Sequence, residues 1–328
     1  MGVRKTESRL PQGLQASDLG EAVVATDGRC ALVSCITGPL VEKRENLYVA
    51  FVTDAGLAAS AASYEWTFTL DSGTPVVQTT AFGEMAFSPP STGILTIVLR
   101  ITDAGNAEQA TLKLRQEVGP LNEDLETMIA ANIDKPGPAV SNIDVVREVV
   151  NDHNPYYNEV SLKTPEPDTV FRDFLFGMTN DGALKKTAAD RKLQMDTVAA
   201  SINTDETDFA NSVAGGLGVC NVRMLLAVML LPPMAIPFTE LPEPATQNMV
   251  ADQQIRQKLA ELPEPDRIDL FNHVRFPKLN IKLCGQILEA LRDRFFSGTS
   301  FNDVLTKMSG AMGDWILLNY KKGPLHRN

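Results

Sequence analysis

Residues that could carry out chemistry are few in this sequence, and most of them stand alone. The three histidines, His153, His273 and His326, are scattered singly, so neither a catalytic triad nor a zinc site is expected. The HExxH, GxSxG and GxxxxGK[S/T] motifs do not occur. The glycine-rich segment 215–218 lacks a following lysine and does not follow a clear strand, which argues against a phosphate-binding loop. The sequence therefore predicts no metal and no cofactor.

The four cysteines favour a structural role over a chemical one. They show no CxxC spacing and have no nearby histidine partner. Cys30 and Cys35 are separated by an odd offset, which would place them on opposite faces of one strand and argues against a disulfide between them. We expect all four to be buried thiols; they are Cys30, Cys35, Cys220 and Cys284.

One acidic residue stands in a context that catalysis could use. Glu206 is followed by Phe209 and then by the glycine-rich segment 215–218. A carboxylic acid that is still protonated near neutral pH needs a desolvated pocket, because burial raises its pKa. An aromatic ring and a glycine turn could wall such a pocket. The alternative is that Glu206, flanked by Asp205 and Asp208, is a solvated charge at the start of a helix.

Four segments from Glu206 onward resemble the lytic transglycosylase and goose-type lysozyme family. Glu206-Thr207-Asp208-Phe209 is similar to the family's Glu-Ser-x-Phe, and Gly218-Val219-Cys220-Asn221-Val222 to its Gly-hydrophobic-Met-Gln-hydrophobic. Further along, Pro277-Lys278-Leu279-Asn280-Ile281 resembles the family's Pro-x-x-Asn-Ile. Leu318-Asn319-Tyr320-Lys321-Lys322-Gly323-Pro324 resembles its Ala-Tyr-Asn-x-Gly-Pro. The four segments occur in the family's order and suggest a lysozyme-like fold.

The resemblance implies a peptidoglycan-cleaving glycosidase, either a lytic transglycosylase or a muramidase, that acts on glycan strands. Glu206 would be the general acid and then the base, and Asn221, Tyr320, Gly218 and Val219 would contact the substrate. A lytic transglycosylase needs no second protein carboxylate, because the C6 hydroxyl of the substrate closes an anhydro ring. A lysozyme proper would use water and a helper carboxylate.

The same segments depart from the family pattern in ways that suggest a second hypothesis. Cys220-Asn221 replaces Met-Gln, Lys321 replaces the asparagine after the tyrosine, and the stretch from Glu206 to Gly218 is shorter than usual. A lysozyme-like domain with these changes could be catalytically degenerate. It would then serve as a binding or structural component of a secretion or injection machine.

The first third of the chain has the alternation of β-strands. Apolar residues recur at every second position, and turn sequences at 71–73, 89–93 and 103–106 separate the runs. About seven strands fit, which predicts an antiparallel β-sandwich over residues 21–119 after an N-terminal extension of residues 1–20. The alternating positions are Tyr64, Trp66, Phe68 and Leu70, then Leu95, Ile97, Leu99 and Ile101, then Ala110, Leu112 and Leu114.

Two of these runs resemble a polycystic-kidney-disease-type immunoglobulin-like (Ig-like) domain. Tyr64-Glu65-Trp66-Thr67-Phe68 is similar to that family's Trp-x-Phe strand. Residues 91–103 are similar to its glycine-initiated strand of alternating valine and leucine that ends in Thr-Asp. The resemblance implies a module that spaces, docks or binds and has no chemistry of its own.

From Pro120 onward the apolar spacing becomes helical, so residues 120–328 are expected to form one mostly helical domain. The resemblance described above implies that this domain is lysozyme-like. Prolines at positions 232, 237, 242, 244, 263, 265 and 277 punctuate the helices. The fold class is thus α and β in separate domains. The expected helices cover residues 169–178, 183–200, 221–231, 246–262, 280–296 and 301–319.

Charge and hydropathy restrict the partners. With 30 Lys and Arg against 41 Asp and Glu, the formal charge is −11, which argues against a nucleic-acid binder. The most apolar run, 224–231, is too short to span a membrane, and no signal peptide is recognised. We therefore expect synthesis in the cytoplasm. Wall-directed activity would then need export by a non-Sec route, for example as the cargo or effector of a contractile injection system, or release during lysis.

Overall fold

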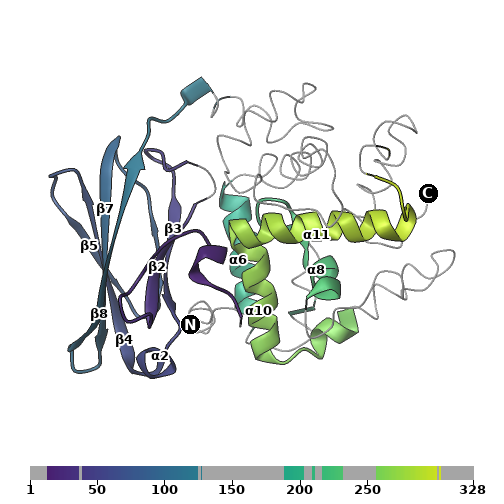
Figure 1. The fold of residues 1–328 in the computed structure, drawn as a ribbon, viewed down its shortest axis with the longest axis horizontal. Coiled ribbons are helices and arrows are strands. Elements are labelled where there is room, and N and C mark those ends of the chain that lie inside the picture. The colour runs from purple at the N-terminus through teal and green to yellow at the C-terminus, as the bar shows by residue number, and fades with distance from the viewer. Residues whose placement is uncertain are drawn as a thin grey trace. The chain divides into compact units, whose positions relative to one another are not determined.

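The computed structural model describes residues 13–36, 39–124, 127, 188–202, 209–210, 216–231, 256–300 and 303 (Figure 1). Two compact units divide the chain: the first holds the described residues up to Thr127 and the second those from Ala188 onward. The content is mixed α and β, and the sheets are antiparallel, as the sequence predicted. The domain limits at 21–119 and 120–328 stay predictions.

In the first unit, one sheet contains β1 (Glu21–Val24), β2 (Cys30–Cys35), β3 (Asn46–Val52) and β6 (Glu84–Phe87), in that order. Every residue of β2 is buried, so both faces of this strand are covered. The short 3-10 helix η1 (Ala16–Asp18) packs against β1 and β2. Cys30 and Cys35 lie at the two ends of β2 on opposite faces, and both are buried, as expected.

The second sheet of this unit has the order β5-β4-β7-β8 and carries the alternation seen in the sequence. Its strands are β4 (Ala61–Leu70), β5 (Val76–Thr80), β7 (Gly93–Asp103) and β8 (Glu108–Val118), and the short helix α2 (Ala55–Ser60) precedes β4. Leu95, Ile97, Leu99 and Ile101 on β7 are all fully buried. The described part of the unit therefore has eight strands, where about seven were expected.

The two sheets share one apolar cluster. It joins Leu32 and Tyr48 of the first sheet to Trp66, Phe68 and the buried positions of β7 and β8 in the second. Trp66 is completely buried, and its indole Nε1 donates a hydrogen bond of 3.1 Å to the Thr80 hydroxyl on the neighbouring strand. An indole N–H buried in this way needs a partner, and β5 supplies it.

Aspartates stabilise two of the turns that were predicted between the strands, those at 71–73 and 103–106. Asp71 adopts a left-handed φ of 48°, and its carboxylate accepts the backbone N–H of Ile94 at 2.9 Å. Asp103 accepts the N–H groups of Gly105 and Ala107, both at 2.9 Å, so one carboxylate closes the turn between β7 and β8.

The described elements of the second unit are α6 (Ala188–Ser201), β9 (Gly216–Leu217), β10 (Val222–Arg223), α8 (Met224–Leu230), α10 (Glu264–Arg275) and α11 (Pro277–Phe295). α8, α10 and α11 pack against one another, and α6 contacts both α10 and β9 (Figure 1). Met224, Val228 and Met229 are buried in this unit.

Two helix predictions were wrong in this unit. The helix expected at 221–231 begins only at Met224, because Val222 and Arg223 pair with Leu217 and Gly216 in an antiparallel hairpin. The helix α10 was missed, because Pro263 and Pro265 were taken as punctuation. Pro265 lies in its first turn, where proline is favoured because the missing N–H has no partner there.

Other helix predictions agree with the structure as far as it describes them. α11 covers the helix expected at 280–296, and it begins three residues earlier, at Pro277. α6 covers most of 183–200, and residues 256–260 of the helix expected at 246–262 are helical. The helix at 169–178 and nearly all of 301–319 lie outside the described residues.

Candidate functional site

The second segment of the lysozyme resemblance, Gly218 to Val222, lies within a tight hairpin. β9 and β10 pair in the register Leu217 with Val222 and Gly216 with Arg223. Between them Gly218 and Asn221 both adopt left-handed φ angles, 72° and 52°, and the Asn221 N–H bonds to the Gly218 carbonyl at 3.2 Å. Glycine and asparagine are the residues that tolerate this conformation, so the sequence builds the turn locally.

Asn280, on the first turn of α11, fixes this hairpin in place. Its Oδ1 accepts the backbone N–H of Cys220 at 2.8 Å, and its Nδ2 donates to the carbonyls of Leu217 at 3.1 Å and Val274 at 2.7 Å. The side chain is completely buried. Val274 lies in the last turn of α10, where carbonyls lack helical partners. One amide thus joins the hairpin, the end of α10 and the start of α11.

The two glycines of the hairpin leave space for asparagine side chains. A Cβ at Gly218 would overlap the Asn280 amide and the Val274 carbonyl, and a Cβ at Gly216 would overlap the backbone and side-chain oxygens of Asn221. The resemblance implied that Gly218 would contact the substrate. In the structure the group that approaches Gly218 is Asn280.

The predicted site residues fall into two groups. Gly218, Val219 and Asn221 lie at the hairpin tip and are partly exposed, whereas Leu217, Cys220 and Val222 beside them are buried. Glu206 and Tyr320 lie outside the described residues, so their predicted roles as acid and substrate contact stay predictions.

Phe209, three residues after Glu206, is part of the core of this unit. Its ring is completely buried, and the guanidinium carbon of Arg267 on α10 lies 5.6 Å from the ring centroid. The carbonyl of the next residue, Ala210, accepts a hydrogen bond of 3.2 Å from Arg256 Nη1. The segment that follows Glu206 is therefore held by two arginines.

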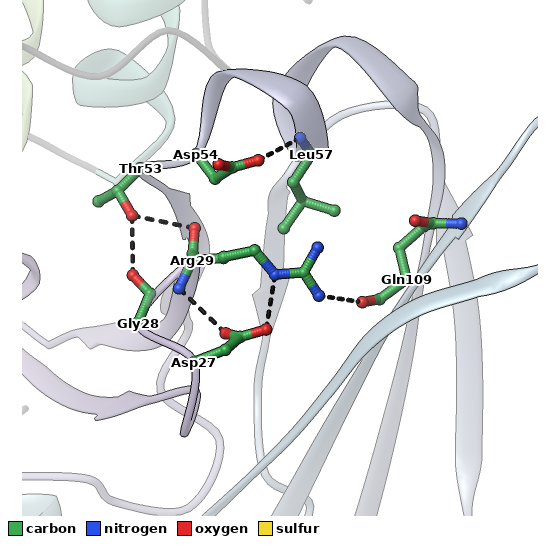
Figure 2. Close-up of polar contacts among 7 residues, drawn as sticks. All are labelled: Asp27, Gly28, Arg29, Thr53, Asp54, Leu57 and Gln109. Atoms are coloured by element: carbon green, nitrogen blue, oxygen red, sulfur yellow. Dashed lines mark hydrogen bonds and ion pairs between the residues drawn. The ribbon is translucent and has the colours of Figure 1, made fainter.

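A separate polar cluster closes one end of the first unit, as Figure 2 shows. Arg29 Nε bonds to the Asp27 carboxylate at 2.6 Å, and Arg29 Nη2 donates to the Gln109 carbonyl at 3.1 Å. Close by, the Asp54 carboxylate accepts the N–H of Leu57 at 2.7 Å and caps α2. These bonds tie a turn, a strand and a helix start together, which is a structural role.

Titratable groups in the first unit have pKa values that their surroundings explain. The Arg29 backbone N–H, followed by its side chain, lowers the pKa of the exposed Asp27 carboxyl. Burial raises the pKa of the Tyr48 hydroxyl and of the Cys30 thiol. A raised pKa keeps that thiol protonated and unreactive, which agrees with a structural role for Cys30.

The part of the chain that the structure describes contains no cluster of three or more His, Cys, Asp or Glu side chains suited to a metal ion. Its one histidine, His273, lies on α10 with its Nδ1 2.8 Å from the carbonyl of Asp269 one turn earlier, as a packed histidine would. Within the same residues, no helix is both long and apolar enough to cross a bilayer.

Comparison with known proteins adds little to this geometry. No family model matches the sequence, and no curated protein is significantly similar to it. One solved structure, a beta-1,2-glucanase from Parabacteroides distasonis, aligns over 75% of this chain and 35% of its own, with 10% sequence identity and a TM-score of 0.25. The chain thus spans about a third of that protein's length, and a likeness this weak supports no conclusion about fold or function.

Sequence reasoning missed two features of the site. Asn280 was noted only as part of a motif, although its bonds organise the hairpin. Arg267 was not singled out, because its helix was not predicted. The signal for α10 was present in its apolar face, Ile268, Phe271 and Val274, which follows helical spacing.

Proposed function

We propose that the second unit is a lysozyme-like domain that cleaves the β-1,4 glycosidic bonds of peptidoglycan glycan strands, with Glu206 as its acid. The observation that carries the proposal is the triple hydrogen bonding of Asn280. Asn280 belongs to the segment 277–281, and it bonds to the hairpin that contains the segment 218–222. The bonded residue Cys220 lies 60 positions earlier in the chain. Two motifs whose order suggested a common fold are thus in direct contact.

One departure from the family pattern is compatible with this proposal. Cys220 replaces a methionine, and it is completely buried while its N–H bonds to Asn280. A buried cysteine behaves as a small apolar residue, so the exchange keeps the chemical character of the position.

The chemistry follows from a single carboxylic acid. Glu206 donates its proton to the glycosidic oxygen as the C1–O bond breaks, which leaves an oxocarbenium-like sugar and a carboxylate. That carboxylate then accepts a proton from the attacking hydroxyl. If the attacker is the C6 hydroxyl of the same sugar, the product is a 1,6-anhydro ring; if it is water, the product has a reducing end.

We propose an Ig-like module for the first unit. Its β5-β4-β7-β8 sheet follows the C′-C-F-G order of variable-type immunoglobulin domains, with β3 and β6 paired opposite, as strands B and E are. Trp66 is buried on the strand that corresponds to C, where that fold keeps its tryptophan. Such a unit would position the enzyme on its target or on a delivery machine.

The test is digestion of purified peptidoglycan, with soluble muropeptides separated and identified by mass. Wild-type protein is expected to release them, and Glu206→Gln is expected to lower the rate by at least about a hundredfold, because general acid catalysis contributes on that order. The matched control is Glu261→Gln, which changes an exposed glutamate of the same unit. If Glu206→Gln digests peptidoglycan at the wild-type rate, the assignment is wrong.

A second candidate function is a non-catalytic glycan-binding or structural component of a secretion or injection machine. The position of Asn221 favours it. This residue stands where the lysozyme family has a glutamine that is expected to contact sugar, but its side-chain oxygen lies against Gly216. Binding of glycan strands without any released product would support this candidate. Delivery by an injection machine is tested separately, by deleting its genes and measuring export of the protein.

A further inference from the structure

Strand β5 of the first unit is an edge strand that is open to solvent on both faces. In the described part of the chain it pairs with β4 alone. Val76 lies opposite the buried Phe68, so its side chain points to the inner face of the sheet, and it is still 44% exposed. Val77, on the outer face, is 55% exposed. The backbone groups that β5 turns away from β4 are therefore accessible to another strand.

Charge distinguishes β5 from the other edges of the two four-stranded sheets. The edge strands β1, β6 and β8 each contain at least one charged residue, namely Glu21, Glu84 and the exposed Lys113. Charged side chains on an edge strand discourage pairing with other chains. β5 has no charged residue, and the whole segment 72–83 has none either. The sequence thus leaves this edge without the protection that charge gives the other three.

A second copy of the same strand suits this edge. Antiparallel pairing about a two-fold axis at Gln78 places this residue opposite itself, where each side-chain amide can donate to the other. Val77 then lies opposite Thr79, and β-branched side chains pair well across strands. Because residues 72–83 are neutral, no like charges meet in this register. A strand of a different protein would be selected by pockets or charges beside the edge, and β5 offers no charge for that selection.

We propose that two copies of this protein associate by antiparallel pairing of their β5 strands, which joins the two β5-β4-β7-β8 sheets into one. The inference concerns the first unit and does not rest on the proposed function. Pro75, which has no backbone N–H, limits the pairing to the strand itself. Two strands of five residues bury well below the roughly 1,200 Å² of a stable interface, so the dimer is weak and depends on protein concentration.

Sedimentation velocity of the 328-residue chain tests the proposal. The protein concentration is varied over roughly 5 to 500 µM, the range in which a weak interface associates. Wild-type protein is expected to shift from monomer toward dimer over this range and to form no larger species. The buffer contains about 0.5 M salt, because each copy has a formal charge of −11 and salt screens the repulsion between copies.

A charge exchange at Gln78 tests the register. Gln78→Lys and Gln78→Glu each place two like charges opposite each other, so each variant alone should raise the dissociation constant of the dimer at least about tenfold. An equimolar mixture of the two variants should restore association, because lysine then lies opposite glutamate. The control is Gln286→Lys, the same substitution at an exposed position of α11, which should dimerise as wild type does.

Melting curves of the two Gln78 variants show whether a loss of association reflects the interface or the fold. Because Gln78 is exposed, both variants should melt within about 2 °C of wild type. If one variant does not fold, the other still tests the interface.

Four outcomes overturn the inference. The first is a wild-type protein that stays monomeric over the whole concentration range, which is also the result if the edge binds a strand of another protein. The second is undiminished dimerisation of the Gln78 variants, which would place the interface elsewhere. The third is a mixture of Gln78→Lys and Gln78→Glu that does not associate. The fourth is growth beyond the dimer, which would indicate that β5 pairs with a different edge of the next copy.

Discussion

The two units position their residues by different physical means. In the first, long strands fix each side chain through many cross-strand pairs, and β4 alone is paired with β7 over nearly its whole length. In the second, the hairpin Gly216–Arg223 is only two residue pairs long. The side chain of Asn280 holds it at its turn.

The difference teaches where each unit is sensitive to substitution. A sheet core depends on apolar volume, which many residue types supply, and it is damaged in proportion to the volume lost. A buried amide with three partners depends on donors and acceptors in fixed places, and glutamine, which has the same groups, carries them one methylene further from the backbone. Volume should therefore govern substitutions in the first unit, and hydrogen bonding in the hairpin of the second.

The largest effect is expected from Trp66→Ala in the first core. It removes a completely buried indole and leaves the Thr80 hydroxyl without its donor. The free energy of unfolding should fall by about 4 kcal/mol. Urea denaturation followed by circular dichroism measures this, with the exposed Lys113→Ala on β8 as control. A loss below about 1 kcal/mol would contradict the volume argument.

In the second unit, Asn280→Ala should cost about 3 kcal/mol, although it removes far less volume. It leaves the Cys220 N–H and the Leu217 and Val274 carbonyls buried, and each unsatisfied group costs about 1–3 kcal/mol. Gln286→Ala is the matched control, since it removes an exposed amide from the same helix. Equal losses in the two variants would mean that the hydrogen bonds do not hold the hairpin.

Two glycines with the same backbone conformation sharpen this comparison. Gly218 and Gly298 have φ angles of 72° and 77°, but a Cβ at Gly298 would meet nothing within 4 Å. Gly298→Ala should therefore cost only the conformational term, about 1 kcal/mol. Gly218→Ala also displaces Asn280 and should cost at least about 1 kcal/mol more. Thermal unfolding of Gly218→Ala and Gly298→Ala measures the cost of the contact with Asn280 as the difference between the two variants. Equal losses of stability would argue against that contact.

The smallest effect is expected in the exposed cluster of the first unit. The pKa of Asp27 is lowered in the folded protein, so its ionised form stabilises the fold above its unfolded pKa, and this is lost as pH falls through the folded value. Asp27→Asn should lower the melting temperature slightly at neutral pH, and the difference between the two proteins should disappear as the pH falls through the lowered folded pKa of Asp27. Glu117→Gln, also exposed, is the control; a difference that persists in acid would point to lost packing.

The contrast between long strands and a short hairpin also explains which elements the sequence could predict. Strands such as β7 could be predicted, because every second residue is apolar and each lies in the core. The hairpin could not, because Val222 and Arg223 pair over two residues only and lead directly into the apolar run of α8. Likewise, nothing in the local sequence reveals that Asn280 bonds to a turn 60 residues earlier. The spacing of apolar residues reveals which face of a helix or strand is buried. A single polar contact between distant segments produces no such repeating pattern in the sequence.

The fit between Gly218 and Asn280 also bears on how the protein could evolve. The amide occupies the space that a side chain at position 218 would need. A lineage that lost the asparagine would free part of that volume, yet the Val274 carbonyl would remain and the left-handed backbone would still favour glycine. The order of mutations is therefore constrained, because position 218 cannot accept a side chain before position 280 has changed. Distant relatives should accordingly keep the glycine more often than the asparagine.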